Sequence, residues 1–217
     1  MVAHGDWPVD PGIIGPFLIA VLLVELTPGP NMGYLAALSA GQGRRDGFAA
    51  VAGVTAGLTA YMLAAAFGLT EIFLVSRPLY EALRWAGVAF LLWLAWDAWN
   101  GASDVGTVDQ NRQSRWRLFL RGFVANILNP KAAIFYITLL PSFIQVDHAA
   151  PRTQALIFGS LHVAVSALVH CSIVLGAASA ANVLAKAGRG GDLSGLRKAM
   201  GVVIALIAVW LAWETRR

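Results

Sequence analysis

Two long apolar stretches of this chain are each interrupted near their middle by proline. The first stretch covers residues 13–40 and contains Leu26-Thr27-Pro28-Gly29-Pro30-Asn31, and the second covers 118–144 and contains Leu128-Asn129-Pro130-Lys131. Proline removes a backbone N–H and clashes with the carbonyl four residues earlier, so a helix breaks there. Lipid cannot satisfy the freed carbonyl, and such breaks occur at membrane depth only beside a cavity or a packed interior. Matching breaks in two halves of a membrane chain indicate a transporter's binding site.

The composition is that of a chain surrounded by lipid. Only 13% of the residues are charged and 58% are hydrophobic, whereas an average soluble domain carries about 25% charged residues. A transmembrane helix needs about 20 apolar residues. Six stretches are long enough: 13–40, 48–74, 79–100, 118–144, 153–179 and 197–213. We therefore expect an all-α integral membrane protein, a single domain over residues 1–217 with six transmembrane helices, of which the first and fourth are broken.

Charge predicts how the chain is oriented. Asp6 and Asp10 precede the first apolar stretch and no Lys or Arg does, so a cleavable signal peptide is not expected. With the N-terminus outside, ten of the sixteen basic residues fall in inner loops and five in outer loops or at the C-terminus. The positive-inside rule then favours both termini outside. The same asymmetry accounts for the net charge of +4, and no nucleic-acid partner is expected.

The two halves of the chain resemble each other beyond the breaks. Tyr34 follows Pro28 by six residues, and Tyr136 follows Pro130 by the same distance. The third and sixth stretches each place two tryptophans at equal offsets from a Gly-Val pair: Trp96 and Trp99 after Gly87, Trp210 and Trp213 after Gly201. Interface tryptophans alone would explain the last pattern, but a duplicated three-helix unit explains the breaks as well. Three spans is an odd number, so we expect two inverted repeats, about 13–100 and 118–213, joined by a polar linker at 101–114.

Two ionisable residues lie near the breaks. Glu25 is in the middle of the first stretch, where a charge costs about 2.5–3.5 kcal/mol on insertion scales. It must face the interior or water, as a proton carrier, an ammonium-binding group or a structural cap for unwound backbone. Lys131 follows Pro130 and either binds a substrate carboxylate or donates to carbonyls that the breaks free. We take Glu25 as the candidate for proton coupling.

A polar substrate site is expected where the two breaks meet. The half-helices that begin near Asn31 and Ala132 direct positive dipole ends inward, which attract a carboxylate, and freed carbonyls attract a cation. A zwitterion suits such a site. The candidate substrate-binding residues are Thr27, Pro28, Gly29, Pro30, Asn31, Tyr34, Asn126, Asn129, Pro130, Lys131 and Tyr136.

The fifth stretch carries His162 and His170, eight residues apart and so on roughly one side of a helix. We expect hydrogen-bonded core histidines, with a proton relay as the alternative. No metal-spaced His/Cys set, nucleophile motif or nucleotide-binding loop is present. The chain is therefore expected to be no enzyme, to hold no cofactor or metal, and to use an ion gradient. The Gly53-x-x-x-Gly57 pattern predicts close helix packing, within the chain rather than in a dimer.

These motifs resemble the LysE/RhtB family of amino-acid exporters over nearly the whole chain. Thr27-Pro28-Gly29-Pro30-Asn31 resembles the family's first-helix signature, and Asn126 with Asn129-Pro130-Lys131-Ala132 resembles its fourth-helix signature. Two positions depart from the pattern. Ser142 stands where many members have Gln, and Leu58 where many have an acidic residue, so the role of that acid is absent here or met by another group such as Glu25.

The resemblance implies export of amino acids or close derivatives from the cytoplasm by proton antiport, across a bacterial inner membrane. The expected partners are an amino-acid substrate, protons and membrane lipid, with a homodimer possible in the family. The wider superfamily includes cation exporters, so a divalent or heavy-metal exporter is an alternative. A non-transporting membrane partner subunit is another.

Overall fold

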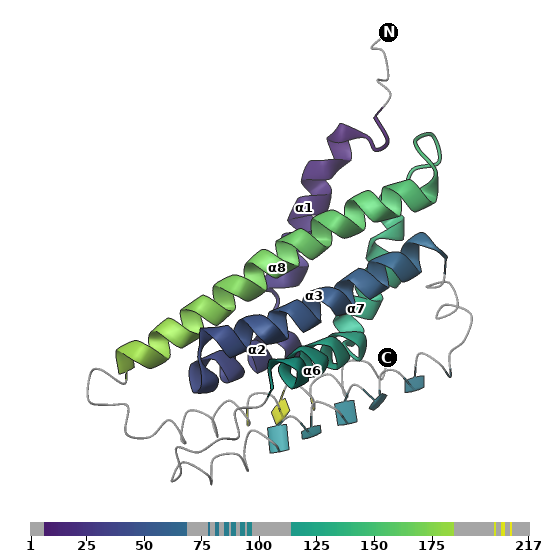
Figure 1. The fold of residues 1–217 in the computed structure, drawn as a ribbon. Helices are drawn as coiled ribbons and strands as arrows, with labels where there is room; N and C mark the ends of the chain where they lie inside the picture. The colour runs from purple at the N-terminus through teal and green to yellow at the C-terminus, as the bar shows by residue number, and fades with distance from the viewer. Residues whose placement is uncertain are drawn as a thin grey trace.

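The computed structural model describes residues 7–68 and 114–184 continuously, with isolated helical positions between 78 and 96 and between 202 and 209. Every regular element in the two continuous segments is a helix (Figure 1). The expected third and sixth spans and the polar linker fall largely or wholly outside these two segments. Two described helices are long and apolar enough to cross a membrane, or four spans if each bent pair counts as one.

The first apolar stretch forms two helices with a break between them. Helix α1 covers Pro11–Leu26 and α2 covers Pro30–Gln42, and they meet at an angle of 58°. Thr27 and Gly29 each precede a proline and each adopt extended backbone. Proline disfavours helical backbone in the residue before it, so Pro28 and Pro30 together hold the connection open.

The second broken stretch forms α6 (Arg115–Ile127) and α7 (Pro130–Ile134), followed by a π-helical turn at Phe135–Leu139 and a 3₁₀ turn at Pro141–Phe143. The bend between α6 and the segment that follows is 52°. Asn129 is extended before Pro130, and its side chain accepts a hydrogen bond from the backbone N–H of Lys131 at 3.1 Å. Both predicted breaks are therefore present at the predicted prolines.

Two unbroken helices, α3 (Arg44–Ala66) and α8 (Pro151–Leu184), complete the continuously described part. Helix α3 begins before the expected span of 48–74 and ends earlier, because Gly68 adopts φ 73°. A left-handed glycine just beyond the last turn ends a helix at low cost. Helix α8 extends the expected span of 153–179 at both ends and packs against α1, α2 and α3 (Figure 1).

Glycines bring α3 and α6 into backbone contact. A Cβ atom at Gly53 would overlap the carbonyl of Phe119, and one at Gly122 would overlap the carbonyl of Ala50. Gly57 lies in the same interface, against Asn126. The prediction that the Gly53-x-x-x-Gly57 pattern serves packing within the chain is confirmed. This close approach fixes α6, and the break that follows it, against α3.

An aromatic cluster fixes α1 against α8. The ring of Phe17 lies 4.7 Å from that of Phe158 and 6.2 Å from that of Phe135, between ring centroids. All three side chains are fully or almost fully buried. Because Phe135 belongs to the π-helical turn, this cluster also ties the second broken segment to the first.

Candidate functional site

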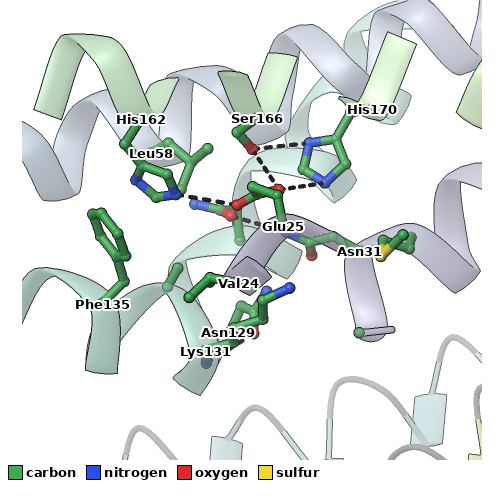
Figure 2. Close-up of a pocket in the computed structure, with 14 residues that line it drawn as sticks. Val24, Glu25, Asn31, Leu58, Asn129, Lys131, Phe135, His162, Ser166 and His170 are labelled. Carbon is green, nitrogen blue, oxygen red and sulfur yellow. Dashed lines mark hydrogen bonds and ion pairs between the residues drawn. The ribbon is translucent and has the colours of Figure 1, made fainter. Parts of the chain in front are cut away.

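The two breaks lie in contact with each other. The ammonium nitrogen of Lys131 donates to the carbonyl oxygen of Thr27 at 2.9 Å, and the Lys131 side chain lies against Gly29. Nearby, Nδ2 of Asn31 donates to Oδ1 of Asn126 at 2.9 Å, which joins α2 to α6. The expected meeting of the two bends is therefore present (Figure 2).

A pocket lies between the bends, and α8 lines one side of it (Figure 2). Its polar lining comes from all three pieces of structure: Glu25 and Asn31; Asn126, Asn129 and Lys131; and His162, Ser166 and His170. The space inside that can take the centre of a water molecule measures about 20 Å³. A void of that size holds about one water, so the pocket is closed to a molecule as large as an amino acid.

Glu25 is the centre of a buried hydrogen-bonded cluster. Its Oε1 lies 3.1 Å from Nε2 of His162, and its Oε2 accepts from the hydroxyl of Ser166 at 3.1 Å. Nε2 of His170 lies 3.8 Å from Oε2. Residues at i, i+4 and i+8 share one face of a helix, and for this reason α8 directs all three side chains at one carboxylate.

Two further contacts belong to the cluster, and the one to Tyr136 leads beyond the pocket lining. Nδ1 of His162 lies 3.1 Å from the hydroxyl of Tyr136, and Nδ1 of His170 lies 3.3 Å from that of Ser166. Tyr136 is fully buried and stacks on Tyr61 at 5.8 Å between ring centroids. We refer to Glu25, His162, Ser166, His170 and Tyr136 as the Glu25 cluster.

The Asn31–Asn126 pair has hydrogen-bonding capacity to spare. Both side chains are buried, and after their mutual hydrogen bond Oδ1 of Asn31 and Nδ2 of Asn126 have no partner. Exchanging N and O in both amides would still leave one donor and one acceptor unused. An unpaired buried polar group costs about 1–3 kcal/mol, so a water molecule or a polar ligand that bonded these two atoms would lower the free energy of the folded protein.

The structure brings together part of the predicted substrate site. Gly29, Asn31, Asn126, Asn129 and Lys131 line the pocket beside Glu25. The remaining predicted residues do not line it: Thr27, Pro28, Pro30, Pro130, Tyr34 and Tyr136. Thr27 is exposed and its hydroxyl donates to the carbonyl of Leu23 at 2.7 Å, because a threonine in the last turn readily bonds backward along its own helix.

Lys131 has the contact expected of its structural role, a carbonyl at the other break. The carbonyl of Ile127, at the second break, accepts from the hydroxyl of Tyr61 at 2.7 Å. Both histidines are buried and hydrogen-bonded as expected, but each also faces Glu25, a contact that their spacing in the sequence does not predict.

Ser166 and Leu58 also line the pocket, although neither belongs to the predicted site. Ser166 lies midway between the two histidines, so the same helical spacing would have found it once the histidines were placed in the site. Leu58 occupies the position at which family resemblance expects an acid. A carboxylate there would face the pocket that holds Glu25.

Two histidines and a carboxylate are also a familiar set of metal ligands. Within the described segments, however, no group of three His, Cys, Asp or Glu side chains is arranged to hold a metal ion. The two imidazoles approach different oxygens of Glu25 rather than a common point.

Apolar helices that break where they meet, around a small polar pocket, define a membrane protein of the transporter class. The family model described as LysE type translocator matches residues 22–215, and the chain belongs to this family. Translocators move substrates without converting them, which supports the expectation that the chain is not an enzyme.

Curated relatives are named as efflux proteins. A homoserine/homoserine lactone efflux protein of Salmonella typhi is 33% identical over 90% of this chain and 94% of its own length. A cysteine/O-acetylserine efflux protein of Salmonella choleraesuis is 28% identical over 68% of this chain and 71% of its own. A leucine efflux protein of Klebsiella pneumoniae is 26% identical over 62% of this chain and 65% of its own length. No solved structure gives a significant match.

Proposed function

We propose that this protein exports amino acids or close derivatives from the bacterial cytoplasm by proton antiport, through the pocket between the two breaks. One observation carries the proposal. Glu25, Lys131 and an amide pair with unused hydrogen-bonding groups line one pocket at the point where two helices are broken. The names of the relatives support the substrate class, since they share no side-chain chemistry but all denote amino acids or derivatives.

The carboxylate of the substrate is proposed to bind near Lys131 and the start of α2. Asn31 and Met32 lie in the first turn of α2, where backbone N–H groups have no partner within the helix. The ammonium of Lys131 points to the same break. Aligned N–H groups and a nearby cation favour an anion. The spare donor of Asn126 supports the same assignment.

The ammonium group of the substrate is proposed to bind on the side of Glu25. This is the one carboxylate among the described residues of the pocket, and the spare acceptor of Asn31 lies in the same lining. An amino acid bound between Glu25 and Lys131 would then have both of its charges paired. Because these contacts are to groups that every α-amino acid carries, they leave the choice of side chain to the apolar part of the wall, such as Leu58.

Substrate entry requires movement, since the pocket now holds about one water. We propose six spans in two inverted three-helix repeats within a single domain, with alternating access by tilting one repeat against the other. The bends of 58° and 52° at corresponding prolines support a repeat. Both termini are proposed to lie outside the inner membrane. The homodimer implied by family resemblance is tested by light scattering of the purified protein.

The test is efflux from proteoliposomes that contain only the purified protein. Vesicles are loaded with labelled homoserine, leucine, cysteine or a divalent metal and assayed with and without a pH gradient. We expect amino-acid flux that a pH gradient drives. Flux of the metal alone would favour a cation exporter, and no flux of any solute would favour a partner subunit.

A site variant and a matched control locate the substrate. Asn126→Leu removes the spare donor at similar volume and is expected to raise KM for the transported amino acid. Ser172→Ala is the control, because Ser172 is exposed on α8 and bonds only to the carbonyl of Leu168 in its own helix. Equal KM values in the two variants would place the substrate elsewhere.

A further inference from the structure

We propose that the coupling proton is held between Nε2 of His170 and Oε2 of Glu25, while His162 keeps one neutral tautomer and positions the same carboxylate. This inference rests on the proposed proton-coupled export and names the groups that carry the proton. It follows from where hydrogen atoms can lie in the Glu25 cluster, of which Figure 2 shows all members except Tyr136.

The hydroxyl of Ser166 fixes the tautomer of His170. A serine hydroxyl has one hydrogen, and here it is donated to Oε2 of Glu25 at 3.1 Å. The contact between Ser166 and Nδ1 of His170, at 3.3 Å, must then be donated by Nδ1. A neutral His170 with its hydrogen on Nδ1 presents a bare lone pair at Nε2, 3.8 Å from a carboxylate oxygen. A proton on Nε2 converts this arrangement of two acceptors into an ion pair.

His162, by contrast, has no ring nitrogen with an unused lone pair. Its Nε2 lies 3.1 Å from Oε1 of Glu25, and its Nδ1 lies 3.1 Å from the hydroxyl of Tyr136. The neutral tautomer with hydrogen on Nε2 donates to Glu25 and accepts from Tyr136, so both nitrogens are satisfied. A second proton on His162 would leave the hydroxyl hydrogen of Tyr136, which is fully buried, without its acceptor. His162 is therefore a positioning residue.

The charges around the cluster agree with one added proton. Lys131 of α7 lines the same pocket, and its positive charge opposes any further protonation. Tyr61 of α3 stacks on Tyr136 with its hydroxyl donated to a backbone carbonyl. The described wall from α2 and α3 is otherwise Asn31, Met32 and Leu58, which carry no charge.

Coupling follows from competition for one carboxylate. With the proton on His170, Glu25 already has a cationic partner; without it, the substrate's ammonium can take that role. The proton reaches Nε2 of His170 from the outer water after substrate leaves, and passes to the inner water when the next substrate binds. Each cycle moves a zwitterion outward and one positive charge inward.

The transport test compares three histidine variants in vesicles that are acidic inside by one pH unit. For one proton per substrate, such a gradient supports at most about tenfold accumulation. We expect His170→Gln to abolish the gradient-driven part, and His162→Gln to keep it because the glutamine amide still donates to Glu25. His148→Gln is the control, since His148 does not line the pocket. Full gradient-driven accumulation in His170→Gln would overturn the proposal.

Nitrogen NMR of histidine-labelled protein in liposomes tests the proposal without transport. The His170 signal of the wild type is identified as the one that is missing from the spectrum of His170→Gln. As pH falls, we expect this signal to change from the neutral form with hydrogen on Nδ1 to the doubly protonated form. The signal missing from His162→Gln should stay neutral with hydrogen on Nε2. The reverse assignment refutes the inference, whereas failure of the wild type to move any amino acid refutes the proposed function.

Discussion

Replacing Gly53 with alanine should destabilise the protein, although alanine is the better helix former. At Gly53 an added Cβ would overlap the carbonyl of Phe119 across the α3–α6 interface, and the atom met is backbone, which cannot rotate away. Overpacking of this kind costs about 1–3 kcal/mol. Alanine's higher helix propensity offsets about 0.5–1 kcal/mol of this cost, so we expect a net loss of up to about 2.5 kcal/mol from the difference of the two effects.

Gly176→Ala is the matched control. Gly176 also lies within a long helix, α8, but no atom outside its own helix turn lies within 4 Å of an added Cβ. Only the propensity term remains, and we expect a gain of about 0.5–1 kcal/mol. Both variants are unfolded reversibly in mixed detergent micelles beside the wild type. If Gly53→Ala proves as stable as Gly176→Ala, the inferred backbone contact between α3 and α6 is wrong.

Three further predictions concern the pocket. Lys131→Met removes a charge-assisted hydrogen bond worth about 1.5–3 kcal/mol. In this variant, a cysteine placed at position 27 should react faster with a water-soluble thiol reagent. An unchanged rate would show that the contact does not hold the bends together. Glu25→Gln keeps the side chain's shape without its charge and should abolish flux driven by a pH gradient, so undiminished flux removes Glu25 from coupling. Adding Leu58→Asp to the Glu25→Leu variant should restore part of the flux driven by a pH gradient, since both positions line one pocket. A double variant that is stably folded but inactive would contradict this.

Local stereochemistry was enough to predict the breaks. Pro28, Pro30 and Pro130 each lack an N–H and each disfavour helix in the preceding residue, so the interruptions follow from the sequence alone. The meeting of the breaks also followed, because unsatisfied carbonyls in lipid need a polar partner. Close packing at Gly53 was also predicted from local structure, since a glycine without a side chain lets the backbone of another helix approach closely.

The Glu25 cluster could not be predicted in the same way. Glu25 and His162 are 137 residues apart, and their contact depends on how α8 is rotated against α1. That rotation is set by side-chain packing, notably by the contacts of Phe17 with Phe158 and Phe135. Sequence periodicity predicts which face of a helix is buried, but not which helix that face packs against. The π-helical turn at Phe135–Leu139 is similarly hidden, because it arises from a shift in hydrogen-bond register rather than from a breaking residue.

The structural and functional interpretations of Lys131 are not exclusive. Its ammonium satisfies the carbonyl of Thr27, which the first break leaves without a helical partner. A substrate carboxylate that drew Lys131 away would expose this carbonyl and forfeit about 1.5–3 kcal/mol, unless the bend itself changed to give Thr27 another donor. Binding would then favour a different angle between α1 and α2. A ligand can shift a conformational equilibrium only through such a difference in interaction between the two states, and the break supplies one at the point where the substrate is proposed to sit.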